Sequence, residues 1–95
     1  MTKYEVLYIL SSGLDEAAIN AQTEKFAELV KTSGGEVESV NKWGLKKLAY
    51  PINYKTEGYY VLMNFAIDDN LFTKELERQM RIADEVVRFL VTRKG

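Results

Sequence analysis

The chain has 95 residues, of which 46% are hydrophobic and 28% charged, a composition that excludes a largely disordered protein. This length supports one hydrophobic core and leaves no room for a second, so we expect a single domain over residues 1–95. The net charge of −1 argues against a protein that holds nucleic acid by its overall charge, but screening over about 8 to 10 Å permits a local basic patch.

The N-terminal third predicts a central strand followed by an amphipathic helix. From Tyr4 to Leu10, side chains alternate between a fully apolar face and a face that is apolar except at Glu5, as in a strand in the middle of a sheet. Ser11-Ser12-Gly13 breaks the strand, Asp15 is placed to cap a helix, and Gly34-Gly35 ends that helix. The helical stripe expected to face the core comprises Ile19, Thr23, Phe26, Ala27 and Val30.

The middle of the chain predicts a long hairpin with an irregular first strand. Within Glu36–Tyr50 the apolar spacing changes phase, which indicates a β-bulge near Trp43-Gly44. Pro51 cannot donate a hydrogen bond to a sheet, so this strand must end there or lie at an edge. A polar connection from Asn53 to Gly58 leads to a third strand over Tyr59–Ile67. One face of that strand is expected to carry Val61, Met63, Phe65 and Ile67, and the other Tyr60, Leu62, Asn64 and Ala66.

The C-terminal third predicts a second helix and a last strand. Asp68-Asp69 is expected to cap the helix rather than to bind a metal. The last strand is expected over Val86–Thr92, with Arg93 and Lys94 after it. The buried stripe of the helix comprises Phe72, Leu76, Met80 and Ala83.

The order strand, helix, strand, strand, helix, strand predicts a fold of the α+β class. Right-handed crossovers place both helices on one face of a four-stranded antiparallel sheet, which gives the ferredoxin-like split βαβ sandwich, βαββαβ. The first and third strands lie in the middle of the sheet, and one face of the sheet has no helices. That face would carry enough apolar surface to mark an interaction site, with a homodimer contact or a modest solvent-facing patch as alternatives. Its apolar residues are Leu7, Ile9, Tyr60, Leu62 and Leu90.

The sequence offers little for catalysis. Cysteine and histidine are absent, which removes the commonest general base, the commonest thiol nucleophile and the usual zinc ligands. Neither a Walker-type nor a GxGxxG glycine pattern occurs. No apolar run reaches the roughly 18 residues of a membrane span, and no signal-peptide layout is present. We therefore expect a cytoplasmic protein that is not an enzyme, with no metal, no cofactor, no small-molecule substrate and no membrane partner.

Two other families with this topology fit the sequence poorly. A small acylphosphatase-like hydrolase needs a glycine-rich anion cradle with an arginine after the first strand, and Ser11-Ser12-Gly13-Leu14 has neither feature. The RNA-recognition motif stacks bases on third-strand aromatics, but Tyr60 here fills the position of a small residue. Val61 and Asn64 stand where that motif requires aromatic residues.

The run Trp43–Ile52 combines lysines with aromatic residues, which suits a surface that meets phosphate, sugar or a protein. This run, followed by Gly58-Tyr59-Tyr60, resembles the signature of the bacterial small-subunit ribosomal protein numbered six. The opening Tyr4-Glu5-Val6 and the closing segment from Arg81 to Arg88 fit the same family. The family often has arginines where this chain has Lys46 and Lys47, and lysine keeps the attraction to phosphate but loses the bidentate fork.

The resemblance implies a structural ribosomal protein that binds the central domain of small-subunit ribosomal RNA together with the small-subunit ribosomal protein numbered eighteen. The apolar residues of the open sheet face would contact that protein. The competing hypothesis is a free-standing ferredoxin-like regulatory module that dimerises through its open sheet face and senses a small molecule. The residues expected to contact RNA are Lys3, Lys46, Lys47, Arg88, Arg93 and Lys94, with Tyr4 and Tyr50 packing on sugar or bases.

Overall fold

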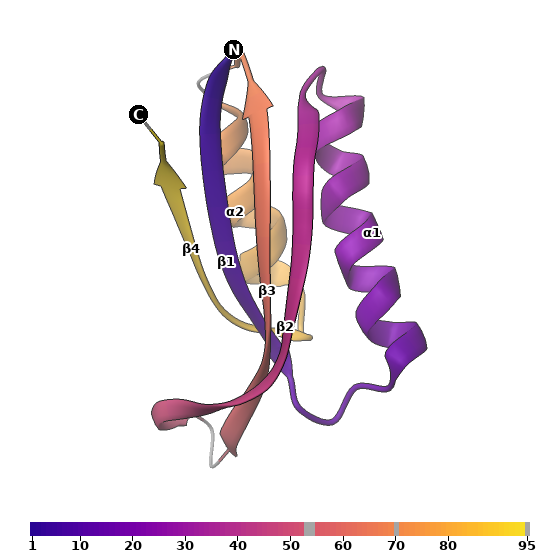
Figure 1. The fold of residues 1–95 in the computed structure, drawn as a ribbon, viewed down its shortest axis with the longest axis vertical. Helices are drawn as coiled ribbons and strands as arrows, with labels where there is room; N and C mark the ends of the chain where they lie inside the picture. Colours follow the sequence, from indigo (N-terminus) through magenta and orange to yellow (C-terminus); the bar gives the residue numbers. More distant parts are fainter. Residues whose placement is uncertain (53–54, 70, 95) are drawn as a thin grey trace.

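The computed structural model describes residues 1–52, 55–69 and 71–94, and it describes the side chains of all of these except residues 49–52 and 55. Its sheet has the order β2-β3-β1-β4 with every neighbouring pair antiparallel, and both helices pack on one face (Figure 1). The predicted fold class is therefore confirmed. The elements are β1 Thr2–Ser11, α1 Glu16–Thr32, β2 Glu36–Ile52, β3 Lys55–Ile67, α2 Phe72–Ile82 and β4 Val86–Arg93.

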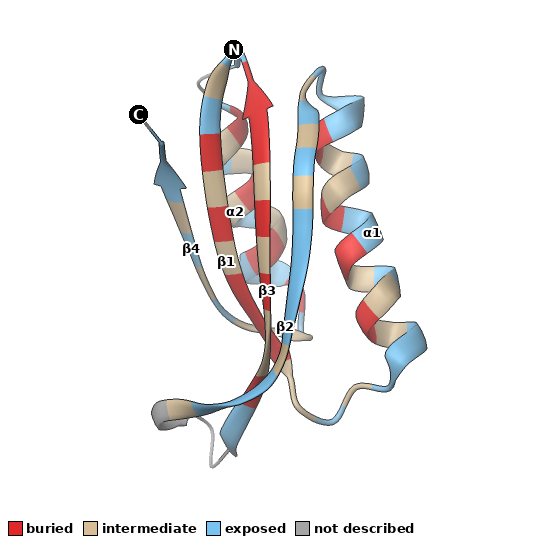
Figure 2. Cartoon of the chain, in the orientation of Figure 1, coloured by how far each residue is buried: buried red, intermediate tan, exposed pale blue. Residues whose placement is uncertain are grey.

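The hydrophobic core lies between the helices and the two central strands, β1 and β3 (Figure 2). Val6 stands opposite Met63 in the register of these strands, and both are fully buried. The ring of Tyr8 meets that of Phe26 from α1 edge-on at 5.3 Å. The alternation of each strand thus sends its predicted core residues toward the helices, and the predicted assignment of strand faces is confirmed.

Helix α1 begins and ends where the sequence predicts. The side chain of Asp15 accepts a hydrogen bond from the Ala18 N–H at 2.8 Å, which satisfies one of the free donors of the first turn. After the helix, Gly34 has φ 90°, a left-handed conformation that favours glycine. Neither described helix is long and apolar enough to cross a membrane.

Helix α2 begins differently from the prediction. Leu71 occupies the N-cap position and makes no capping hydrogen bond with its side chain. Asp69 instead accepts from the Leu71 N–H at 2.9 Å through its side chain, and from the Phe72 N–H at 3.2 Å through its carbonyl. Aspartate favours such a local turn as readily as a cap, so the prediction that Asp68-Asp69 caps the helix was wrong in position.

The β2–β3 hairpin is longer than predicted. β3 begins at Lys55 instead of Tyr59, because backbone pairing of polar residues such as Glu57 with Lys47 needs no apolar side chain. The predicted bulge is confirmed, since the register skips one residue between Lys42 and Gly44, and Gly44 has φ 89°. β2 is an edge strand, one of the two places where the sequence allows Pro51.

Gly58 of β3 lies opposite Ser11 of β1, and its surroundings leave no space for a side chain. A Cβ atom added there would lie 2.3 Å from Cγ2 of Ile9. We expect Gly58→Ala to lower the free energy of unfolding by about 1–3 kcal/mol, measured by urea denaturation, because Ile9 or the hairpin must shift. Gly13→Ala is the control, since nothing lies within 4 Å of its added Cβ, and it should change stability by less than about 0.5 kcal/mol. Equal unfolding midpoints for the two variants would contradict this packing.

Candidate partner and nucleic-acid surface

The sheet face away from the helices, here called the open face, carries rows of side chains that cross several strands. The register places Leu7 of β1 between Leu62 of β3 and Leu90 of β4. In the next row, Ile9 lies between Tyr60 and Arg88. Because side chains in register on one face lie about 5 Å apart, each row forms a continuous contact surface.

A depression of about 420 Å³ lies on the open face. Exposure differs sharply around it, since Ile9 is only 7% exposed and Leu90 is 65% exposed. Leu62, which does not line the depression, neighbours Leu7 in the register. The structure therefore brings together the residues that the sequence predicted for a protein partner. The lining comprises Leu7, Ile9, Tyr60, Arg88, Phe89 and Leu90.

Trp43, which was not among the predicted site residues, extends this surface across β2. Its ring stacks on Tyr60 with centroids 6.5 Å apart and planes inclined by 9°, and the residue is 46% exposed. The ammonium of Lys46 lies 5.5 Å from the centroid of the Trp43 ring, within cation–π range. Trp43 is the only tryptophan and stands at the predicted bulge, a signal that could have identified it.

Lys46 and Lys47 point to opposite faces of the hairpin. Lys46 stands opposite Gly58 in the register and lies over Trp43, which stacks on the open face. Lys47 stands opposite Glu57, and successive strand residues alternate between faces. The two lysines, which were predicted to act together, thus have different surroundings.

A second basic group lies where β1 begins and β4 ends. A hollow of about 360 Å³ there is lined by Met1, Thr2, Lys3, Arg93 and Lys94. Lys3 lies 3.5 Å from Glu38, and Lys94 lies 3.8 Å from Glu5. All four of these side chains are at least a third exposed, and exposed ion pairs contribute only about 0–1 kcal/mol, so an incoming phosphate could compete for the lysines.

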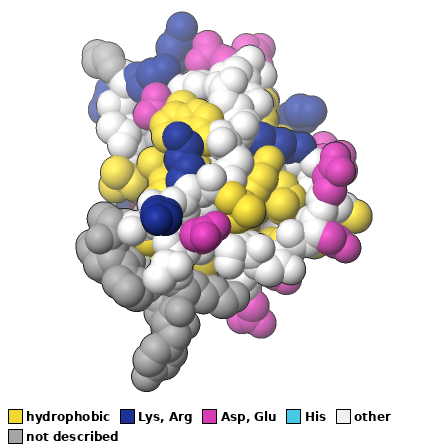
Figure 3. Space-filling view, turned by 60° about the horizontal axis from the view of Figure 1, so that its bottom comes forward, with side chains coloured by type: hydrophobic (Ala, Val, Ile, Leu, Met, Phe, Trp, Pro, Cys, Tyr) yellow, Lys and Arg dark blue, Asp and Glu magenta, His cyan; other side chains and the backbone are white. Residues whose placement is uncertain are grey.

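The cations near the open face border its hydrophobic surface rather than form one block. In Figure 3, lysine and arginine side chains lie over and beside patches of hydrophobic side chains. Arg88 lines the apolar depression, whereas Lys3, Arg93 and Lys94 line the second hollow. Lys46, Arg88 and the cations of the second hollow therefore lie around an apolar centre, whereas Lys47 lies on the other face of the hairpin.

The two tyrosines predicted to contact RNA have different outcomes. Tyr4 is 8% exposed and its ring stacks on Phe65 in the core at 5.5 Å. Its ring faces the helices because Tyr4 shares the alternation of Val6, so we leave it out of the proposed RNA surface. Tyr50 belongs to the side chains outside the described part of the structure.

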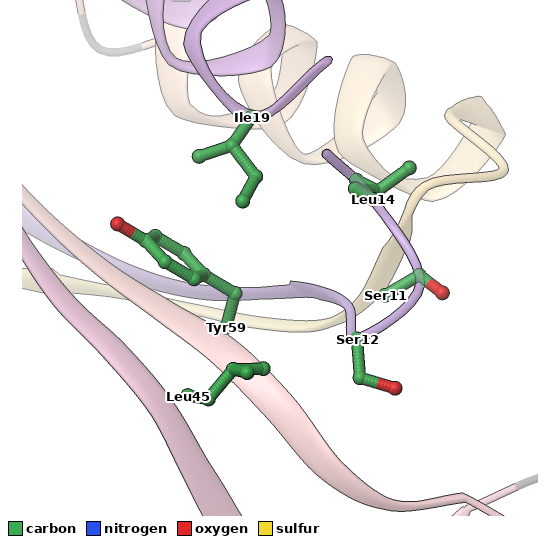
Figure 4. Close-up of a pocket in the computed structure, with 6 residues that line it drawn as sticks. All are labelled: Ser11, Ser12, Leu14, Ile19, Leu45 and Tyr59. Atoms are coloured by element: carbon green, nitrogen blue, oxygen red, sulfur yellow. The ribbon is translucent and has the colours of Figure 1, made fainter. Parts of the chain in front are cut away.

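A smaller cavity of about 240 Å³ lies at the base of the hairpin (Figure 4). It opens between the loop after β1, the start of α1 and the hairpin, and Ile19 points toward Tyr59 across it (Figure 4). Apart from the hydroxyls of two serines and Tyr59, its lining is aliphatic or aromatic, which suits an apolar side chain better than a reacting substrate. The lining comprises Ser11, Ser12, Leu14, Ile19, Leu45 and Tyr59.

The large pKa shifts concern residues outside this surface. Side-chain hydrogen bonds from Arg78 and Gln79 lower the pKa of Glu75 on α2 to about 2. Burial in the core raises the pKa of the Tyr8 hydroxyl. In the described ranges 1–52, 55–69 and 71–94, no cluster of three or more carboxylates is placed to hold a metal ion. What this surface offers is therefore apolar contact and positive charge.

Comparison with known proteins gives a consistent result. The profile of the family described as ribosomal protein S6 matches residues 3–93. The small ribosomal subunit protein bS6 of Clostridium novyi is 52% identical over 91 residues, which cover 96% of this chain and 95% of that protein. The corresponding protein of Clostridium acetobutylicum is 50% identical with the same coverage. The crystal structure of 30S ribosomal protein S6 from Thermotoga maritima superposes with a TM-score of 0.91 at 26% identity, covering 98% of this chain and 87% of that one.

Substitution should separate the core tyrosine from the surface residues. Tyr4→Ala removes a buried ring that stacks on Phe65, and we expect it to lower the free energy of unfolding by about 3–5 kcal/mol. Leu90→Ala is the comparison on the neighbouring strand, and at 65% exposure it should cost less than about 1 kcal/mol. Thermal and urea unfolding of both variants measure this difference. A small effect at Tyr4 would return its ring to the candidate RNA contacts.

Proposed function

The chain belongs to the ribosomal protein S6 family, and from this premise we propose that it is a structural constituent of the small ribosomal subunit in the cytoplasm. It binds the central domain of small-subunit ribosomal RNA together with the small-subunit ribosomal protein numbered eighteen. The observation that carries this proposal is an apolar depression on the helix-free sheet face with cations beside it, one of them Arg88 in its lining and others in the hollow where β1 begins and β4 ends.

The protein partner covers the apolar part of the open face. Leu7, Leu62 and Leu90 form one row there, and Leu90 is largely exposed in the isolated chain. Removing apolar surface from water is favourable by about 25 cal/mol per Å², and this gain opposes the entropy lost on association, so covering this row favours binding. Trp43 and Tyr60 add a stacked aromatic pair, and such residues often dominate binding energy at protein interfaces.

The RNA contacts the cations around that centre. Lys3 and Lys94 make only exposed or partly exposed ion pairs, and Arg93 lines the same hollow, so phosphates can be held there without breaking strong contacts. Lys46 and Lys47 extend along the hairpin. A local border of this kind lets a chain with a net charge of −1 join an RNA assembly.

Loss of the hairpin lysines should weaken binding to a fragment of the small-subunit RNA central domain. We expect Lys46→Ala with Lys47→Ala to lower affinity and to reduce the salt dependence of binding by up to about one unit of log–log slope per lost phosphate contact. Gel shifts over a salt series, with the partner protein present, measure both effects. Lys74→Ala on an exposed position of α2 is the control and should bind as the unaltered chain does. Unchanged affinity and slope in the double variant would remove these lysines from the RNA surface.

A charge in the apolar row should impair association with the partner protein. Leu62 is half-buried beside Leu7 on the open face, so Leu62→Glu should leave the isolated chain folded and weaken partner binding about tenfold or more. The fluorescence emission of Trp43 distinguishes the free chain from the partner-bound chain, because burial of its exposed ring by the partner shifts the emission to shorter wavelength. Global unfolding of the variant would show that Leu62 belongs to the core, and undiminished binding would move the partner to another surface.

A further inference from the structure

Among the described residues, Arg88 is the only cation that lines the open-face depression. In the register it stands opposite Ile9, which is 7% exposed, and it precedes Leu90 by two residues on the same face of β4. The rest of the lining is aliphatic or aromatic. Arg88 therefore places a positive charge within the surface that is proposed to bind a protein.

Arg88 lies far from the cations of the second hollow. β4 runs from the end of the sheet where the hairpin projects to the end where both chain termini lie (Figure 1). Arg93 follows Arg88 by five residues, so their Cα atoms lie roughly 16 Å apart along an extended strand. Charges on a solvated surface are screened over about 8 to 10 Å, so a phosphate held in the second hollow adds little attraction at Arg88.

A protein that covers the depression removes water from the Arg88 side chain. A guanidinium carries five N–H donors, and taking this charge out of water is strongly unfavourable unless new acceptors replace the water. A carboxylate offers two oxygens that match the planar fork of the guanidinium, so it accepts two hydrogen bonds at once. Among the groups that a protein can supply, a carboxylate therefore compensates best for the lost water.

The side chains around Arg88 favour a protein over RNA as the source of the anion. An RNA phosphate also matches the guanidinium fork, but the charged and hydrated RNA backbone would accompany it into the depression. Leu7 and Leu90 in the adjacent row, with Leu90 65% exposed, gain stability only from contact with apolar groups. A protein segment supplies both an anion and apolar side chains.

We propose that Arg88 binds a carboxylate side chain of the protein partner, with apolar side chains of the same partner beside it in the depression. This inference rests on the proposed function, in which that partner covers the open face, and it assigns Arg88 to the protein contact rather than to RNA. Apolar contact alone discriminates poorly between partners, whereas a bidentate pair fixes distance and direction. Arg88 thus determines which proteins the open face accepts and how they lie on it.

Charge reversal at Arg88 tests this pairing by calorimetric titration of the chain with the partner protein. Arg88→Glu should bind the partner about thirtyfold or more weakly, because two carboxylates then meet where water is excluded. Arg88→Lys keeps the charge but loses the fork, so its affinity should lie between those of Arg88→Glu and the unaltered chain. Lys74→Ala, on an exposed position of α2, is the control and should bind as the unaltered chain does. Because Arg88 is exposed, both of its variants should keep the urea unfolding midpoint.

A reciprocal charge change identifies the carboxylate on the partner. Lysine is placed in turn at each aspartate and glutamate of the partner protein. One of these partner variants should restore binding to Arg88→Glu and should bind the unaltered chain poorly, because like charges then meet.

Gel shifts with the central-domain RNA fragment and saturating partner separate the protein contact from an RNA contact. Arg88→Ala should leave the log–log salt slope of RNA binding unchanged, because it removes no phosphate contact. Arg93→Ala, in the second hollow, should reduce this slope by up to about one unit.

Three results would overturn the assignment of Arg88. They are undiminished partner binding by Arg88→Glu, no partner variant that restores it, or a salt slope of RNA binding that falls by about one unit in Arg88→Ala, which would make Arg88 a phosphate contact. In each case the proposed function stands, provided that the unaltered chain binds the partner and the RNA. An unaltered chain that binds neither would overturn the proposed function itself.

Discussion

Both helices pack on the same face of the sheet, and the rest of the structure depends on this constraint. The central strands β1 and β3 alternate side chains between a core face and an open face. Val6, Met63 and Phe65 on one side are fully buried against the helices. The other side has no helix to cover it and yet carries Leu7, Ile9 and Leu62, apolar residues that a solvent-facing sheet would ordinarily replace with polar ones. This side of the sheet thus retains the apolar surface on which the proposed partner contact rests.

The bulge at Gly44 makes the hairpin part of that side. A positive φ at Gly44 accommodates the extra residue, and Trp43 turns its ring onto Tyr60 over the open face. Lys46 then lies over Trp43, while Lys47 takes the opposite face. This backbone irregularity therefore joins an aromatic pair to the apolar rows, and the ordinary alternation of the strand after it places the two neighbouring lysines on different faces.

Most of the fold could be predicted from local periodicity in the sequence. The alternation in β1 and β3, the cap at Asp15 and the bulge near Gly44 depend on neighbouring residues, and each was predicted. Features that depend on side-chain contacts between distant parts of the sequence were not predicted. The burial of Tyr4 on Phe65 and the stacking of Trp43 on Tyr60 require knowledge of which residues meet in space. The turn at Asp69 was missed because an aspartate can stabilise a turn or cap a helix with the same side chain.

Methyl NMR of the isotope-labelled chain, titrated first with the partner protein and then with the RNA fragment, tests whether the open face binds the partner. We expect the methyl signals of Leu7, Ile9, Leu62 and Leu90 to shift when the partner is added, before any RNA is present. The core methyls of Val30, Val61 and Leu76, all fully buried, should stay nearly unchanged. If the signals of the open-face methyls stay unchanged while those of other surface methyls shift, the partner binds another surface and not this side of the sheet.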